Sequence, residues 1–156
     1  RDPEMSRGLG DVYKRQVFGK QAEQYASLFP FPIYPMNYVS NEKELVDIYN
    51  AVDLYVTPSL QDNLPNTIVE AMACGIPCVG FNVGGIPQMI DHLHNGYVAE
   101  YQSAKDLANG IRWTLTEGEY DNLSEEACRK ALSSYSESII SMKYIDIYNK
   151  ITGSHA

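Results

Sequence analysis

The sequence of 156 residues predicts an α/β protein with a Rossmann-like parallel sheet and helices on both faces. Short apolar runs alternate along the chain with longer segments of helical spacing, as in successive β–α units. The runs are apolar on both faces, which favours parallel strands that helices cover on both sides. Ligands bind such sheets beyond the carboxyl ends of the strands, so the loops after the strands are the expected place for a site.

Short-range signals predict the elements of the first third of the chain. Residues 17–20 predict the end of a strand and a glycine turn. Two prolines interrupt residues 21–32, which we expect to form a loop or a short helix, and a short strand is expected around residues 33–36. Asn41 is a typical helix-capping residue and predicts that a helix follows over residues 42–51.

The rest of the chain continues the alternation. β-branched and aromatic residues predict the strands, and apolar residues at helical spacing predict the helices. Pro58, Gly75 and the pair Gly84–Gly85 mark places where elements end. The predicted elements are strands at 53–59, 77–81 and 95–100, and helices at 66–74, 86–90, 103–117, 121–134 and 136–151.

The N-terminal residues differ from the remainder. Residues 1–16 are rich in basic residues and poor in large aliphatic ones, and their end, GDVYKRQ, resembles translated adaptor sequence of fragmentary metagenomic genes. We therefore expect residues 1–16 to be a non-native leader. Residues 17–152 are then the folded domain, and residues 153–156 are a tail.

Composition narrows the class of partner and the compartment. The net charge of −8 argues against a nucleic-acid partner, which requires clustered Lys and Arg. No apolar run approaches the length of about 18 residues that a transmembrane segment needs, and there is no signal-peptide pattern. Three cysteines without metal-ligand spacing indicate free thiols and a cytoplasmic protein.

Two acids, Asp62 and Glu70, lie eight positions apart around a predicted strand end and helix start. Carboxylates accept strong hydrogen bonds from sugar and ribose hydroxyls. Residues 63–67 can present backbone N–H groups to a phosphate at the helix start. Gly84 and Gly85 allow a close approach of the backbone. Together these features predict a site for a sugar nucleotide.

The stretch TPSLQDNLPNTIVEAMACGIPCVGFNVGGIPQMI, residues 57–90, resembles the donor-binding segment of the large retaining glycosyltransferase family four, whose GT-B fold consists of two facing Rossmann-like domains. The family pattern is P-S, then E-x7-E, then A-M-A-C-G-x-P-V-V and a G-G-x-P-E loop. Asp62 and Gln88 stand here where the family usually has glutamate. The final YIDIYNKI resembles the family's last helix, which crosses back toward the other domain, and the resemblance covers residues 17–152.

The resemblance implies that residues 17–152 are a partial C-terminal, nucleotide-sugar-binding domain of a GT-B enzyme. The implied activity transfers a sugar, with retention, from a nucleotide diphosphate donor to a saccharide or lipid-linked acceptor. A UDP-sugar is the family-level expectation for the donor, and the acceptor would bind an N-terminal domain that this chain lacks. The isolated chain is therefore expected to be inactive, and the full-length parent is a candidate peripheral protein at the inner face of the membrane.

Roles for individual residues also come from the resemblance. Asp62 resembles the acid that faces the transferred sugar, and Glu70 resembles the acid that holds the ribose, so both are the predicted catalytic residues. No metal or cofactor is expected, because the chain has no D-x-D and no strand-linked G-x-G-x-x-G. The predicted donor-binding residues are Val39, Ser40, Asn63, Leu64, Pro65, Asn66, Thr67, Gly84 and Gly85.

Several alternatives remain open at this point. The chain could be a sugar-nucleotide-binding module without catalysis, or part of a GT-B-fold UDP-sugar epimerase. Locally, Thr67 and Glu70 have the spacing of a capping box, so Glu70 could serve only to start a helix. Asp62 could be a solvated turn residue. His92 and His94 flank an Asn-Gly turn and are expected to be surface residues rather than metal ligands.

Overall fold

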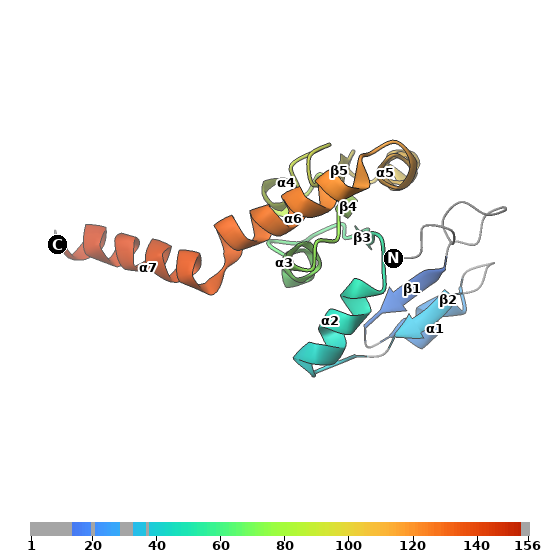
Figure 1. The fold of residues 1–156 in the computed structure, drawn as a ribbon, viewed down its shortest axis with the longest axis horizontal. Coiled ribbons are helices and arrows are strands. Elements are labelled where there is room, and N and C mark those ends of the chain that lie inside the picture. The colour runs from blue at the N-terminus through green and yellow to red at the C-terminus, as the bar shows by residue number, and fades with distance from the viewer. Residues whose placement is uncertain (1–13, 20, 29–32, 37, 154–156) are drawn as a thin grey trace. The chain divides into compact units, whose positions relative to one another are not determined.

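The computed structural model, drawn in Figure 1, describes residues 14–19, 21–28, 33–36 and 38–153. The chain divides into two compact units, Arg1–Leu45 and Val46–Ala156. The described strands pair in parallel and alternate with helices, which confirms the predicted α/β class. The sequence predicts one sheet, whereas the described residues form a two-stranded sheet in the first unit and a three-stranded sheet in the second.

The first unit contains β1 (Arg15–Phe18), α1 (Ala22–Ala26) and β2 (Ile33–Met36). β1 and β2 pair in parallel, with Arg15 opposite Ile33, and α1 packs against both strands. β1 begins two residues before the predicted start, so the last two residues of the predicted leader belong to a strand. Residues 1–13 of that leader lie outside the described residues.

Helix α2 (Glu42–Asn50) begins as the sequence predicts and ends one residue earlier. The side-chain oxygen of Asn41 accepts a hydrogen bond from the Lys43 N–H at 3.0 Å, and its carbonyl accepts one from the Leu45 N–H at 3.0 Å. Asn41 is therefore the predicted capping residue, because it satisfies one of the N–H groups that the first turn leaves without a partner.

The second unit is built on three parallel strands in the order β3-β4-β5: β3 (Tyr55–Thr57), β4 (Cys78–Phe81) and β5 (Gly96–Ala99). Every residue of the central strand β4 is buried, as expected for a strand covered on both faces. Cys78 pairs with Tyr55 on one side and with Gly96 on the other. Because the strands run in parallel and in register, their carboxyl ends meet at one edge of the sheet.

The helices of this unit are α3 (Asn66–Ala73), α4 (Ile86–Met89), α5 (Ala104–Thr116), α6 (Tyr120–Tyr135) and α7 (Glu137–Thr152). α3 lies beside α6 and also packs on β4, while α5 packs on β4 and β5 (Figure 1). The α6 face that is buried is made of Leu123, Ala127 and Ala131, which recur every fourth residue. Small side chains on this face let α3 approach closely.

Helix α7 has no buried residue, although its sequence is rich in apolar side chains. The exposed ones are Met142, Tyr144, Ile145, Ile147, Tyr148 and Ile151. This is the segment that resembles the family's last helix. None of the described helices is both long enough and apolar enough to cross a membrane.

The cysteines are free thiols, as the sequence predicts. Cys78 is fully buried on β4, and burial raises the pKa of its thiol. Cys74 and Cys128 are half-buried, and the Cys128 thiol donates a weak hydrogen bond to the Ala73 carbonyl at 3.7 Å.

Candidate functional site

Three loops follow the carboxyl ends of the parallel strands of the second unit. Residues 58–65 follow β3, residues 82–85 follow β4, and residues 100–103 follow β5. The Tyr101 hydroxyl donates a hydrogen bond to the Leu60 carbonyl at 3.2 Å, which ties the third loop to the first. This edge is where ligands bind open parallel sheets, so the three loops form the candidate site.

The glycine loop lies directly against the acidic loop. A Cβ atom added to Gly84 would lie 1.6 Å from the Asp62 carbonyl oxygen, and one added to Gly85 would lie 1.9 Å from the Asn63 carbonyl oxygen. Gly84 also has a φ of 55°, in the left-handed region that glycine adopts without strain. The close approach in this structure is between the two loops, so the glycines fix the position of the Asp62 backbone.

The start of helix α3 leaves its first N–H groups without a side-chain cap. Pro65 occupies the capping position with φ −66° and ψ 118°, and its side chain makes no capping hydrogen bond. The Ile68 N–H donates to the Pro65 carbonyl at 3.0 Å. Asn66 and Thr67 precede Ile68 in the first turn of the helix. These predicted donor-binding residues therefore lie at the positive end of the helix dipole, beside the loop that carries Asp62.

Glu70 lies inside helix α3 rather than at its start. One of its carboxylate oxygens, Oε2, accepts a hydrogen bond from the Tyr49 hydroxyl at 3.0 Å. The capping-box alternative is wrong, because Pro65 is the capping residue and Thr67 is already within the helix. Glu70 is half-buried, and its carboxylate is bound by a residue of another helix.

Tyr49 and Tyr55 form an aromatic pair next to Glu70, with ring centroids 6.1 Å apart in an edge-to-face arrangement. Burial and the neighbouring Glu70 carboxylate raise the pKa of Tyr49. Burial also raises the pKa of Tyr55, where a hydrogen bond with Thr67 opposes the shift and the charges of Glu70 and Asp62 add to it. Both acids thus contribute to the raised pKa of one tyrosine.

The other predicted residues differ in placement. Asn63 and Leu64 lie in the acidic loop, and the Leu64 side chain contacts the position where Gly85 would carry a Cβ. Val39 and Ser40 belong to the other compact unit, where they follow β2. Their assignment to the donor site stays a prediction.

The sequence did not indicate a role at the site for Tyr49, Tyr55 and Tyr101, whose side chains contact residues of the site. Tyr49 looked like one member of the apolar stripe of α2, and Tyr55 looked like an ordinary strand residue. A buried tyrosine hydroxyl requires a polar partner, and that requirement was the available signal. Local sequence patterns could not identify Glu70 as the partner of Tyr49, because the two residues are 21 positions apart. Tyr101 carried no signal at all.

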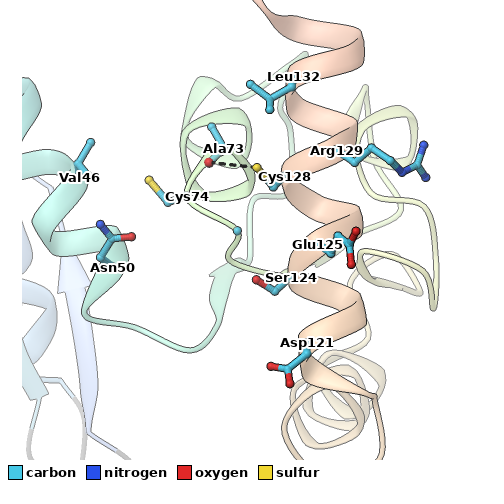
Figure 2. Close-up of a pocket in the computed structure, with 11 residues that line it drawn as sticks. Val46, Asn50, Ala73, Cys74, Asp121, Ser124, Glu125, Cys128, Arg129 and Leu132 are labelled. Carbon is cyan, nitrogen blue, oxygen red and sulfur yellow. Dashed lines mark hydrogen bonds between the residues drawn. The ribbon is translucent and has the colours of Figure 1, made fainter. Parts of the chain in front are cut away.

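A pocket of about 1010 Å³ lies elsewhere in the second unit (Figure 2). It is lined by Val46 and Asn50 of α2, by the end of α3 from Ala73 to Gly75, and by one face of α6. None of the predicted site residues lines it. The pocket is therefore separate from the loops at the carboxyl edge of the sheet, where the two acids lie.

The described residues contain no group of three or more His, Cys, Asp or Glu side chains that could hold a metal ion. His92 and His94 are exposed, as expected. The Nδ1 atom of His92 accepts a hydrogen bond from the Val98 N–H at 3.1 Å, and its ring packs edge-on against Tyr97. His92 therefore has a structural role at the edge of β5.

A sequence model of the family described as glycosyl transferases group 1 matches residues 36–131. Over 117 residues, or 74% of this chain, the sequence is 29% identical to the N,N'-diacetylbacillosaminyl-diphospho-undecaprenol alpha-1,3-N-acetylgalactosaminyltransferase of Campylobacter jejuni. The match covers 31% of that protein. The chain thus spans less than a third of the length of this curated relative.

Solved structures share the fold. The structure of Anabaena HepE in complex with UDP-glucose matches with a TM-score of 0.73 and 18% identity, over 88% of this chain and 41% of that chain. The C-terminal domain of a glycosyl transferase group 1 family protein, LpcC of Francisella tularensis, matches with a TM-score of 0.62 and 20% identity, over 76% of this chain and 62% of that chain. The predicted GT-B C-terminal domain fold is confirmed.

The contact between the glycine loop and the acidic loop predicts the effect of one added methyl group. Gly84→Ala and Gly85→Ala should each lower the free energy of unfolding by about 1–3 kcal/mol or more, because the new Cβ would overlap rigid backbone atoms. Chemical denaturation measures this loss, and amide chemical shifts of residues 60–65 report the displaced loop. The control is Gly118→Ala, where the nearest atom to the added Cβ is the end of the Leu123 side chain, and backbone oxygens lie no closer than 3.5 Å. An equal loss of stability in Gly118→Ala and Gly84→Ala would contradict the claim that contact with rigid backbone causes the loss.

The raised pKa of Tyr49 predicts a loss of stability at alkaline pH. Below pH 10 both folded and unfolded chains keep the phenolic proton, so this group adds no pH dependence. Above pH 10 the unfolded chain releases the proton first, and the free energy of unfolding should fall by at most about 1.4 kcal/mol per pH unit for this residue. Denaturation between pH 8 and 11 should show a shallower fall in Tyr49→Phe, and an unchanged slope would contradict the prediction.

Proposed function

This chain belongs to the glycosyl transferases group 1 family, as its sequence predicts, and we propose that it forms the donor-binding half of a retaining GT-B glycosyltransferase. The proposed reaction transfers a sugar from a nucleotide diphosphate, a UDP-sugar, to a saccharide or lipid-linked acceptor. The observation that carries the proposal is the placement of Asp62 in the loop before the uncapped start of α3, at the carboxyl edge of a parallel sheet, with Glu70 further along the same helix.

In the proposed complex Glu70 accepts hydrogen bonds from the ribose hydroxyls, and Asp62 accepts them from hydroxyls of the transferred sugar. Ionised carboxylates suit both tasks, since they only accept and their hydrogen bonds are strong. The uncapped N–H groups at the start of α3 would bind the diphosphate between the ribose and the sugar. Catalysis then rests on positioning and on electrostatic stabilisation of the leaving diphosphate and the oxocarbenium-like centre.

The three loops carry no Lys or Arg at residues 58–65, 82–85 or 100–103. The charge of a diphosphate must therefore be balanced by backbone N–H groups and by cations from outside these loops. This is consistent with a donor site that other parts of a larger protein complete.

Similar proteins support the choice of substrates. HepE was solved with UDP-glucose bound, and the Campylobacter relative is named for a diphospho-undecaprenol acceptor. A lipid-linked acceptor would place the parent protein at the cytoplasmic face of the membrane as a peripheral enzyme. We include that location and that acceptor class in the proposal.

Titration of UDP against two variants tests the assignment of the acids. Glu70→Gln should weaken UDP binding roughly ten- to a hundredfold, because a charged hydrogen bond contributes about 1.5–3 kcal/mol. Asp62→Asn should leave UDP affinity unchanged and remove only the additional affinity that the sugar of a UDP-sugar provides. Calorimetry or ligand-observed NMR measures both. If Glu70→Gln binds UDP as tightly as the unsubstituted chain, the ribose assignment is wrong.

Catalysis by this chain alone is a separate question. We expect donor binding without sugar transfer, because the chain spans under a third of its curated relative and its loops lack cations for the diphosphate. Incubation with UDP- and GDP-sugars and a panel of oligosaccharide acceptors, followed by product analysis, measures transfer. Sustained turnover would show that these residues form a complete active site.

A further inference from the structure

We propose that Tyr49 is a positioning residue of the donor site, which holds one oxygen of the Glu70 carboxylate so that the other faces the ligand. The inference rests on the proposed function for the identity of the ligand. Its structural part, that Tyr49 fixes the conformation of Glu70, can be tested without any ligand.

The contact joins two elements that are distant in the sequence. Tyr49 lies in the last turn of α2, and Glu70 lies in α3. The tyrosine hydroxyl donates to Oε2 of Glu70 at 3.0 Å, which is within the range of O–H···O hydrogen bonds and at its long end. Among the described residues, Tyr49 alone donates a hydrogen bond to the Glu70 side chain, so Oε1 is left to accept from a ligand.

The tyrosine is itself held rigidly. Only 3% of Tyr49 is exposed, and its ring packs edge-to-face on Tyr55 of β3. The Tyr55 hydroxyl lies near the Thr67 side chain at the start of α3. Tyr49, Tyr55 and Thr67 thus connect α2, β3 and α3 around the carboxylate. A rigid, buried donor can hold a flexible side chain in one rotamer.

Glutamate needs such a constraint if it is to bind a ribose. A half-exposed glutamate side chain has three rotatable bonds and samples several rotamers, and immobilising it on binding costs entropy. When Tyr49 fixes the carboxylate beforehand, the side-chain entropy is already lost on folding of the domain. The ligand then binds an acceptor that is already oriented. The hydrogen bond also satisfies a tyrosine hydroxyl that burial would otherwise leave without a partner.

The same geometry explains what a glutamine would do at position 70. Its amide oxygen could accept from Tyr49 in place of Oε2, and its NH2 group would then face the ligand. An NH2 group donates and cannot accept from ribose hydroxyls. If Tyr49 acts on the ligand only through the side chain at position 70, removal of its hydroxyl should have no further effect on UDP binding once Glu70 is replaced by alanine, which leaves no carboxylate to position.

A ligand-free NMR experiment tests the structural part. Side-chain couplings of Glu70 should indicate one rotamer in the unsubstituted chain and rotamer averaging in Tyr49→Phe. The matched control is Tyr97→Phe, because the Tyr97 hydroxyl also donates to a carboxylate oxygen, that of Asp106, at 3.0 Å. Tyr97→Phe should leave Glu70 in one rotamer. Averaging of Glu70 in the unsubstituted chain, or a single rotamer in Tyr49→Phe, would overturn the proposal.

UDP affinity provides the functional measurement. Tyr49→Phe should weaken UDP binding roughly three- to tenfold, Tyr97→Phe should not, and the double variant Tyr49→Phe/Glu70→Ala should match Glu70→Ala alone. Equal weakening in the two tyrosine variants would show a general loss of stability and overturn the proposal. If Glu70 becomes averaged in Tyr49→Phe but the unsubstituted chain does not bind UDP, the positioning of Glu70 is upheld and the proposed donor site is contradicted.

Discussion

The candidate site depends on one steric constraint, the contact between the backbone at Gly84–Gly85 and the carbonyl groups of Asp62 and Asn63. Parallel pairing of β3 and β4 brings the two loops to the same edge of the sheet, but it does not set the distance between them. The short distance is possible only because Gly84 and Gly85 have no side chain, since any Cβ there would overlap the acidic loop. The glycines therefore determine where Asp62 stands relative to the start of α3.

Glu70 is governed by a different kind of constraint. Its backbone position follows from α3, which packs on α6 and β4, so it is fixed by the core of the domain. Its carboxylate orientation follows from Tyr49, a residue of α2. The two acids are thus placed independently, one by backbone contact between loops and one by helix packing with a side-chain hydrogen bond. A substitution that displaces one need not displace the other.

The sequence predicted much of this structure, and the failures have physical causes. Each described strand and helix was expected within a few residues, because apolar periodicity and Pro or Gly punctuation are local signals. The family and the segment that carries both acids were also predicted. At Gly84 the sequence shows that a backbone must come close but not which one; the structure shows the Asp62 carbonyl there, and the donor-binding role of Gly84 stays a prediction. The hydrogen bond of Tyr49 to Glu70 depends on tertiary packing, which local patterns do not encode.

The charge distribution limits how a site of this kind could hold a phosphate. The chain carries a net charge of −8, and the proposed diphosphate site at the start of α3 has Asp62 in the loop before it and Glu70 within the helix. Several of the described cations already bind acids elsewhere: Lys130 pairs with Asp91, Arg129 with Glu126 and Lys150 with Asp146. Within these loops a diphosphate would be attracted by oriented N–H groups, whose partial charges act over the first turn of a helix, and cations from outside the loops would add to that attraction. In the proposed complex the ligand presents hydroxyls to the acids and phosphate to the start of α3, and a nucleotide sugar carries both kinds of group.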